Sequence, residues 1–242
     1  DGLLDLHQLV RTRIPIAGPT RVSASLFDRE SGREYRVVPQ GPAIAPEEWR
    51  QCLERLAEAD CEYLVASGSL PPGVPDDFYA RVAADAAGRG IKVVLDSSGP
   101  GLREGIAGGH LHLIKPSLGE LRQLSGLPLE TDAAIAEAAM AIVESGKAEL
   151  VAVTMGHEGA LLASKAGTVR LPALDVVAQS AVGAGDCFVA GMVYALATGH
   201  SAGEAFRFGI AAGSAAVLTP GTDLARPDDI ERLLPQVGAV TA

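Results

Sequence analysis

The sequence has few aromatic residues and no excess of positive charge. Aromatic side chains make up 4% of the 242 residues, so the core has to be built from Ala, Val, Leu and Ile. That composition favours a parallel sheet covered by helices over an aromatic-rich β sandwich. The formal net charge of −10 argues against general nucleic-acid binding, which needs a basic surface. It leaves room for a small anionic ligand, because a phosphate site needs only a few local donors.

Cysteines and long apolar runs are also scarce. Cys52, Cys61 and Cys187 include no CxxC spacing, which favours a reduced, cytoplasmic protein. No apolar run approaches the roughly 20 residues of a membrane span, and no signal-peptide pattern opens the chain, so no membrane partner is expected. The first residue is Asp and residues 1–10 have a helical pattern, from which we expect that upstream sequence is missing.

Strands and helices alternate along most of the chain. Two β-prone runs at Thr20–Phe27 and Glu34–Val38, joined by the turn-rich residues 28–33, predict a hairpin. Alternating strands and helices after it imply a parallel sheet with right-handed crossovers. We expect one α/β domain over residues 1–242, with a small β appendage at residues 20–40. The further predicted strands are Tyr63–Ala66, Ile91–Leu95, Leu111–Ile114, Leu150–Thr154 and a second hairpin, Gly159–Ala163 with Thr168–Leu171.

Helical patterns occupy the segments between these strands. Pro46 is placed to start the first of them, because proline suits the first helical position. No long repeat or interdomain linker interrupts the series. The predicted helices are Pro46–Ala59, Asp76–Ala87, Gly101–Ala107, Leu118–Leu124, Asp132–Val143, Gly185–Ala197 and Ala202–Leu218.

The segment Ala181–Asp186, AVGAGD, is the most informative one for chemistry. Small residues let a ligand approach the backbone, and the amides that start a helix point outward to bind anions. Asp186 falls in the first turn of the predicted helix, where it could act as a base toward a hydroxyl beside a bound phosphate. An aspartate here can also simply cap the helix, and the short string alone leaves both interpretations open. It is not a Walker A sequence, since no Lys-Ser/Thr follows.

Other unusual segments also follow predicted strands, at the sheet edge where parallel sheets bind ligands. SGSLPPG at Ser67–Gly73 must be a shaped loop, since it can neither continue a strand nor start a helix. DSSG at Asp96–Gly99 and KPSLGE at Lys115–Glu120 end the next two strands. Lys115 could meet a phosphate and Glu120 could organise Mg²⁺ through water, although each alone is more often a surface charge. TMGHEG at Thr154–Gly159 ends a later strand, and its exposed His157 is assigned no catalysis.

Together and in this order, these segments resemble the ribokinase/PfkB carbohydrate kinase family, in particular its hexose-phosphate branch, that of the minor bacterial 6-phosphofructokinases. RFGIAAGSAAVLTPGT at Arg207–Thr222 completes the match, which runs from about Ile14 to the C-terminus. The resemblance implies a ribokinase-like three-layer αβα fold with a mainly parallel central sheet. The strands within residues 20–40 would form part of a lid that covers the sugar and often supports dimers, so a homodimer through the lid is expected.

The resemblance also implies roles for single residues. Asp186 would remove the proton from the acceptor hydroxyl, and the amides of Gly183, Ala184 and Gly185 would form the anion hole for the transferring phosphoryl group. Mg²⁺ would bridge the phosphates of ATP, helped through water by Glu120.

Nucleotide and sugar contacts follow from the same resemblance. Arg21 matches a sugar-phosphate contact, which suits the planar fork of arginine, and Ser69 lies in the sugar-facing loop. The positions that match the nucleotide side are Lys115, Thr154, Gly156 and Gly159.

The chain departs from the family pattern at several positions. Ser117 stands where Asn is usual, which alters the Mg²⁺–water network, and Ala181 replaces a commoner Thr. Thr219 and Asp223 differ from the types expected beside a K⁺ site, so K⁺ dependence is the weaker implication. The family's N-terminal strands and its Asp and Gly-Gly-Asn sugar contacts have no counterpart here. The carbonyls that would bind K⁺ belong to Ser180, Val182, Ala216, Thr219 and Gly221.

The leading hypothesis is phosphoryl transfer from ATP to the 1-hydroxyl of fructose 6-phosphate. Tagatose 6-phosphate and fructose 1-phosphate are the competing acceptors. A different class, a nucleotide-binding relative without kinase activity, also stays open because of Ser117, Ala181 and the missing start. If that start is missing, a sheet edge and apolar surface are exposed, and poor solubility is expected.

Overall fold

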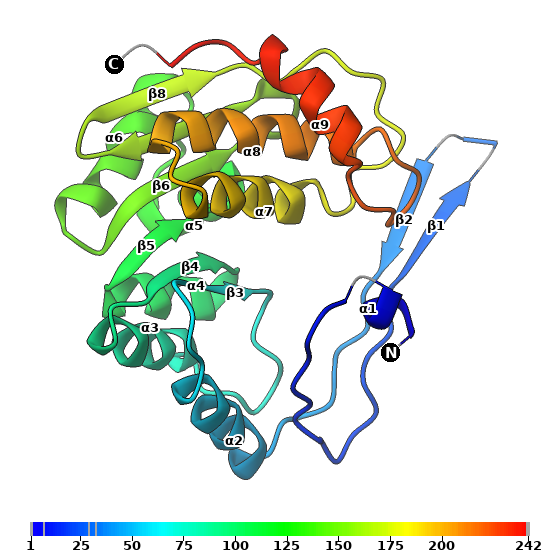
Figure 1. The fold of residues 1–242 in the computed structure, drawn as a ribbon, viewed down its shortest axis with the longest axis vertical. Helices are drawn as coiled ribbons and strands as arrows, with labels where there is room; N and C mark the ends of the chain where they lie inside the picture. The colour runs from blue at the N-terminus through cyan, green and yellow to red at the C-terminus, as the bar shows by residue number, and fades with distance from the viewer. Residues whose placement is uncertain (1, 7, 29, 32, 241–242) are drawn as a thin grey trace.

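The computed structural model describes residues 2–6, 8–28, 30–31 and 33–240. A short helix α1 (Gly2–Leu6) opens the described chain, followed by coil and by the antiparallel pair β1 (Ala24–Asp28) and β2 (Arg33–Val37). In Figure 1 this hairpin projects by itself from the right-hand side of the molecule. The predicted hairpin is thus confirmed, with a first strand that begins four residues later than Thr20. Residues 29 and 32 of its predicted turn lie outside the described residues.

The main sheet has six strands in the order β3-β4-β5-β6-β7-β8. The first four pair in parallel, and β7 and β8 add an antiparallel hairpin at the far edge. The sheet therefore agrees with the predicted parallel arrangement and its terminal hairpin. The strands are β3 (Tyr63–Ser67), β4 (Lys92–Asp96), β5 (Leu111–Ile114), β6 (Ala148–Thr154), β7 (Ala160–Ser164) and β8 (Gly167–Leu171).

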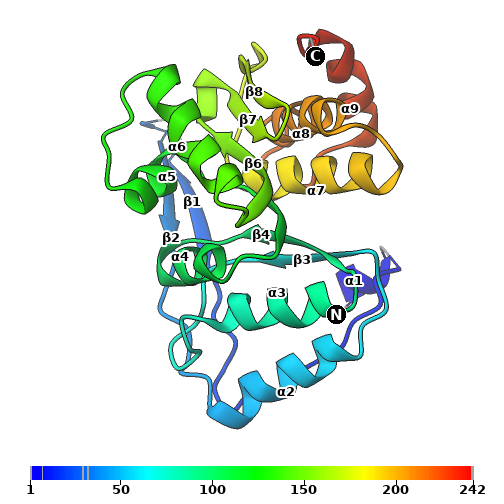
Figure 2. The ribbon, with the colours of Figure 1, turned by 90° about the vertical axis from the view of Figure 1, so that its left-hand side faces the viewer.

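Helices cover both faces of this sheet, which explains its continuous apolar runs. Along β4, Val93 and Leu95 pack into one core cluster while Val94, between them, packs into the other. Figure 2 shows the two helical layers on opposite sides of the sheet. One layer contains α3 (Phe78–Gly88), α4 (Gly99–Gly108), α5 (Leu118–Ser125) and α6 (Asp132–Glu144); the other contains α7 (Ala184–Ala197), α8 (Ala202–Ala216) and α9 (Pro227–Leu233).

Side chains cap several of these helices. Ser117 and Glu120 form a capping box at the start of α5, and Ser201 with Glu204 repeats it at α8. The Thr131 hydroxyl accepts from the amide of Ala134 at the start of α6. These caps satisfy amides that a helix leaves without partners at its N-terminus, and so fix where each helix begins.

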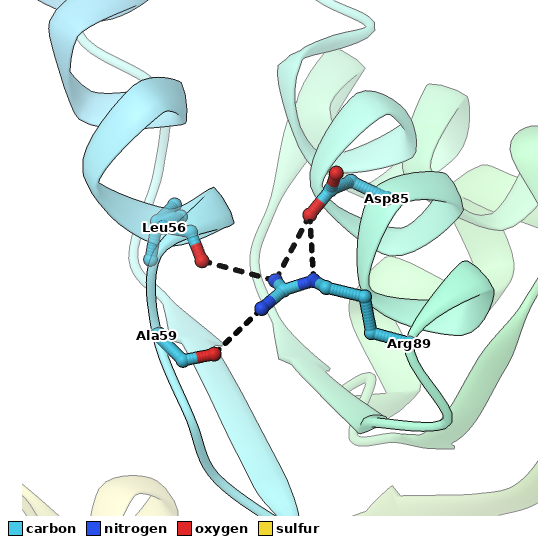
Figure 3. Close-up of polar contacts among 4 residues, drawn as sticks. All are labelled: Leu56, Ala59, Asp85 and Arg89. Carbon is cyan, nitrogen blue, oxygen red and sulfur yellow. Dashed lines mark hydrogen bonds and ion pairs between the residues drawn. The ribbon is translucent and has the colours of Figure 1, made fainter.

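Helix α2 (Pro46–Ala57) lies beyond α3, on the outer side of the layer formed by α3–α6 (Figure 2). Arg89, at the end of α3, connects the two helices (Figure 3). Arg89 donates to the carbonyl oxygens of Ala59 at 2.6 Å and Leu56 at 3.0 Å, where α2 ends; the Leu56 carbonyl also accepts from the amide of Ala59 at 3.1 Å. The same guanidinium donates to Asp85 of α3 at 2.9 and 3.2 Å. Arg89 therefore fixes the end of α2 against α3, with its charge balanced by Asp85.

The C-terminal helices differ from the prediction in two ways. The last predicted helix, Ala202–Leu218, ends at Ala216, because a tight turn follows in which the Thr219 hydroxyl lies 2.8 Å from the Ala216 carbonyl oxygen. Helix α9 was not predicted, although Pro227 at its first turn is a typical start signal. The longest described helix, α8, has 15 residues, and within the described part of the chain none has the length and hydropathy that a bilayer crossing needs.

Candidate active site at the start of helix α7

The glycine-rich segment forms the tight start of α7. Gly183 is the residue before the helix and has φ = 79°, a left-handed conformation that glycine adopts without steric cost. Its carbonyl accepts the first helical bond from the amide of Cys187 at 2.8 Å. The amides of the first turn point out of the helix and carry the positive end of its dipole. Asp186 is exposed in that first turn, the position predicted for it.

Helix α8 holds α7 at short range through glycines. A Cβ at Gly213 would lie 3.1 Å from the carbonyl oxygen of Ala184, in the first turn of α7. Further along, a Cβ at Gly191 would lie 2.7 Å from the Cβ of Ala212, and one at Gly209 would lie 2.6 Å from Cγ of Met192. The two helices therefore approach more closely than side chains would allow, and α8 sets the position of the α7 N-terminus.

A cavity of about 450 Å³ opens beside this first turn. It lies between the C-terminal end of β6, the chain after β8, and helices α7 and α8. Its walls are mostly small and apolar, which suits a flat apolar ring more than a hydrated sugar. The lining residues are Thr154, Gly156, His157, Gly159, Ala160, Ala173, Leu174, Val176, Ala178, Ala181, Ala184, Gly185, Phe188, Ile210, Gly213, Ser214 and Val217.

The glycines on the β6 side of the cavity are required by the backbone. Gly159 has φ = 99°, and a Cβ there would lie 2.2 Å from the carbonyl oxygen of Leu171 and 2.5 Å from the amide of Ala173. Gly156 also has a positive φ, 58°, but has open space around it. A side chain at position 159 would therefore clash with the backbone at the end of β8, so only glycine fits there. At position 156 there is space for a side chain, and glycine leaves that space free for a ligand. His157 is exposed, as predicted.

Lys115 and Asp96 form a buried ion pair beside the first turn of α7. Lys115 follows β5 and Asp96 ends β4; their side chains are 8% and 15% exposed, and Nζ lies 3.2 Å from Oδ1. A Cβ at Gly185 would lie 3.4 Å from the Lys115 Nζ, so the ammonium contacts the first turn of α7. Burial raises the pKa of Asp96; Lys115 opposes this, and the carboxylates of Asp186 and Glu120 add to it.

Glu120 also has a structural role, as part of a capping box at the start of α5, which was not predicted. Its Oε2 accepts from the amide of Ser117 at 2.7 Å, while the Ser117 hydroxyl accepts from the amide of Glu120 at 3.3 Å. The capping box leaves Oε1 as the oxygen that can face a hydrated ion. No group of three or more His, Cys, Asp or Glu side chains among the described residues could hold a metal ion by itself.

The loop after β3 is tied to the end of β4. The carbonyl of Gly68 accepts from the Tyr79 hydroxyl at 2.8 Å and from the Ser97 hydroxyl at 2.9 Å. Ser69, next in the loop, is exposed. Arg21 is exposed in the coil before β1, where its Cδ would lie 3.5 Å from a Cβ at Gly41.

The residues expected around K⁺ lie in two neighbouring segments, one just before α7 and one at and after the end of α8. The amide of Gln179 donates to the carbonyl of Val217 at 2.7 Å, which joins the two segments. Ser180 and Thr219 are buried, at 5% and 2% exposure. The carbonyl of Ala216 has the Thr219 amide at 3.1 Å and the Thr219 hydroxyl at 2.8 Å. Val182 donates its amide to the Ser180 hydroxyl, and Gly221 has φ = 59°.

The structure brings some of the predicted residues together and leaves others apart. Thr154, Gly156 and Gly159 line one cavity with Ala184 and Gly185. Lys115 reaches Gly185 from below. The other predicted site residues are not in the cavity lining described above: Asp186, Gly183, Lys115, Glu120, Arg21, Ser69, Ser180, Val182, Ala216, Thr219 and Gly221. Asp96, the ion-pair partner of Lys115, was noted in sequence only as part of DSSG; its place at a strand end next to the Lys115 strand was the available signal.

Comparison with known proteins agrees with these features. Residues 10–229 match the sequence model of the family described as pfkB family carbohydrate kinase. ATP-dependent 6-phosphofructokinase isozyme 2 of Mycobacterium tuberculosis is 41% identical over 221 residues, which are 90% of this chain and 65% of that protein. The chain thus spans slightly less than two thirds of that relative. The 1-phosphofructokinase of Borreliella burgdorferi is 30% identical over 238 residues, 97% of this chain and 75% of that protein.

The fold agrees as well. The crystal structure of phosphofructokinase-2 from Escherichia coli in complex with potassium superposes with a TM-score of 0.92 at 36% identity. The alignment covers 97% of this chain and 76% of that one. The predicted ribokinase-like α/β fold with a mainly parallel sheet is thereby confirmed. The chain belongs to the pfkB family of carbohydrate kinases.

Proposed function

We propose that this protein transfers the γ-phosphoryl group of ATP to the 1-hydroxyl of fructose 6-phosphate, giving fructose 1,6-bisphosphate. The observation that carries this proposal is the start of α7, where outward-facing amides, an exposed Asp186 and the 450 Å³ cavity meet. The similarity of this chain to the 6-phosphofructokinase isozyme 2 of Mycobacterium tuberculosis supports fructose 6-phosphate as the acceptor.

Asp186 is the proposed base. It takes the proton of the 1-hydroxyl as that oxygen forms its bond to the γ-phosphorus and the bond from phosphorus to the bridging oxygen of ADP breaks. The amides of Gly183, Ala184 and Gly185 stabilise the charge on the transferring group, and the dipole of α7 adds to this. Positioning and charge stabilisation supply most of the catalysis in such a transfer.

The cavity beside α7 is the proposed site of the adenine ring. Its small apolar walls fit a flat ring, and the phosphates would then extend along Gly185 toward Asp186. Thr154, Gly156 and Gly159 form the wall on the β6 side. Lys115 lies where its charge can reach the phosphates.

A Mg²⁺ ion is part of the proposal. Bound to the phosphates of ATP, it would neutralise charge on them during transfer. Glu120 fits a contact through water, since its capping bond occupies only one carboxylate oxygen.

K⁺ has a weaker place in the proposal. The Ala216 carbonyl, one of the five expected ligands, has two donor groups of Thr219 within 3.1 Å, which occupy its lone pairs. Ser180, Val182, Thr219 and Gly221 would have to bind the ion without it. We therefore expect only modest activation by K⁺.

Arg21 and Ser69 are the proposed contacts of the sugar phosphate, and β1–β2 the proposed lid. Both side chains are exposed, Ser69 in the loop after β3 and Arg21 in the coil before β1. The lid is also the proposed dimer contact. Leu26 pairs with Tyr35 across the hairpin and both are more than half exposed, at 58% and 51%, and an isolated two-stranded ribbon is marginally stable by itself. The three free cysteines support a cytoplasmic location.

The second candidate within the same chemistry is a 1-phosphofructokinase, which the likeness to the Borreliella burgdorferi protein favours. A coupled assay of ADP release with Mg²⁺-ATP tests both, with fructose 6-phosphate, fructose 1-phosphate and tagatose 6-phosphate as acceptors. Faster turnover on fructose 6-phosphate supports the proposal. Faster turnover on fructose 1-phosphate favours the second candidate, and ATP binding without turnover on any of the three favours a nucleotide-binding relative.

A further inference from the structure

The ion pair between Lys115 and Asp96 differs from its exposed counterpart at the other end of the same strand. Lys92, which starts β4, pairs with Glu62 at 3.1 Å, but the two side chains are 42% and 64% exposed. Lys115 and Asp96 pair at nearly the same distance, 3.2 Å, with exposures of only 8% and 15%. Burying a charge pair costs desolvation free energy that a surface pair avoids. The Lys115–Asp96 pair is therefore not explained by a gain in stability.

The position of the pair suggests what it does. Lys115 Nζ and Cε lie 3.4 and 3.6 Å from where a Cβ of Gly185 would be. The end of the lysine side chain thus lies within van der Waals reach of Gly185, and its charge lies beside the first turn of α7.

Asp96, Asp186 and Glu120 are the carboxylates around the lysine ammonium. The charges of Asp186 and Glu120 both act on Asp96, so all three lie in one electrostatic neighbourhood. Among the described residues, Lys115 makes its ion pair with Asp96 and none with Asp186 or Glu120. Lys115 therefore pairs with Asp96 and leaves the carboxylate of Asp186 without a direct ion pair to this lysine.

We propose that Asp96 is a positioning residue that holds the Lys115 ammonium beside Gly185, where it faces the transferring phosphoryl group instead of pairing with Asp186. The proposal rests on the kinase function proposed above. Without Asp96, the buried ammonium would turn to the remaining carboxylates or lose its proton. Either change would remove positive charge from the anion hole or weaken the base.

A double-mutant cycle tests this. Asp96→Asn keeps the shape and removes the charge; Lys115→Met keeps the stem against Gly185 and removes the ammonium. Each is expected to lower kcat by roughly 10- to 100-fold, with KM for fructose 6-phosphate changed by less than about threefold. In the double variant, Asp96→Asn should add less than about twofold to the loss of Lys115→Met, because Asp96 acts through the lysine.

Glu62→Gln is the matched control, since it breaks the exposed lysine pair on the same strand, and it should leave kcat unchanged. An unchanged kcat in Asp96→Asn would overturn the proposal, as would independent, multiplying losses in the double variant. If Asp96→Asn alone does not fold, comparison of the double variant with Lys115→Met still decides, because removal of both charges is better tolerated than removal of one.

The same cycle measured on Mg²⁺-ATP binding by calorimetry separates this inference from the proposed function. The affinity losses of the two single variants should be equal and should not add in the double variant. ATP binding with this coupling but without turnover would refute the kinase and keep the positioning role. Turnover by the unaltered protein together with additive losses would keep the kinase and refute the positioning role.

Discussion

The close approach of α7 and α8 predicts a destabilising effect for Gly191→Ala. Alanine normally favours a helix interior over glycine by about 0.5–1 kcal/mol. Here the added Cβ would meet the Cβ of Ala212 at 2.7 Å, the carbonyl oxygen of Phe208 at 3.0 Å and Cα of Gly209 at 3.3 Å. A short side chain and backbone atoms cannot turn away, so α7 must move off α8 by several tenths of an ångström.

Overpacking costs about 1–3 kcal/mol, and contact with backbone atoms that cannot turn away puts this case at about 2–3 kcal/mol. The helix-propensity gain offsets about 1 kcal/mol of it. We expect a net loss of about 1–2 kcal/mol in the free energy of unfolding, which corresponds to a fall of about 2–8 °C in Tm for a chain of this size. Because Asp186 begins the same helix, turnover should fall as well. Denaturant titration followed by circular dichroism measures the stability.

Two further variants make the prediction specific. Ala212→Gly in the Gly191→Ala background removes the shortest contact and should restore part of the lost stability. Gly88→Ala, at the end of α3 with open space around its Cβ, should stabilise by up to about 1 kcal/mol. A Gly191→Ala protein as stable as the unaltered one would refute the inferred close packing.

Three further predictions concern single residues or ions. Asp186→Asn should lower kcat by at least about 100-fold while Mg²⁺-ATP affinity stays within about threefold; a near-normal rate would exclude Asp186 as the base. Arg89→Gln should cost about 1–3 kcal/mol in urea unfolding, since the Ala59 carbonyl loses its donor and the Leu56 carbonyl keeps only backbone donors. The exposed Arg55→Gln should cost less than about 0.5 kcal/mol; equal losses would contradict the role of Arg89 at the end of α2. Replacing K⁺ by Na⁺ should change turnover by less than about threefold, or about 0.7 kcal/mol; loss of activity would show that Ala216 remains a ligand.

Most of the fold could be predicted from apolar periodicity. Runs such as Ile91–Leu95 are buried on both faces of a parallel sheet, so they stand out as continuous apolar strands. Helix α9 was missed because its seven residues are mostly polar, and only Pro227 and the acidic first turn announce it. Its stability comes from packing on α8, through Leu233, which is 1% exposed.

The site was predicted less completely, because its geometry depends on contacts between distant segments. The position of Asp186 at a helix start could be inferred from AVGAGD, since glycine and helix signals are local. The Asp96–Lys115 pair had a weaker signal: the two residues end consecutive predicted strands, but neither segment states that those strands are neighbours with their ends aligned. The capping role of Glu120 had a local signal, Ser-x-x-Glu, which was interpreted only as a metal contact.

The edge strand β3 also bears on how the protein behaves. It ends the order of strands in the sheet, and Val65 at its centre is 47% exposed. An apolar edge of this kind favours pairing with other chains, so low solubility is expected when this chain is produced by itself. Monodisperse behaviour at high concentration, by light scattering, would contradict that expectation.

The central claim is phosphoryl transfer with Asp186 as base. The most direct test is ADP release from Mg²⁺-ATP with and without fructose 6-phosphate, measured on this chain and on any longer product of its gene, each beside its Asp186→Asn variant. The account predicts release that depends on the sugar phosphate and is lost in the variant. Release that ignores the sugar phosphate, or that survives Asp186→Asn, would contradict it.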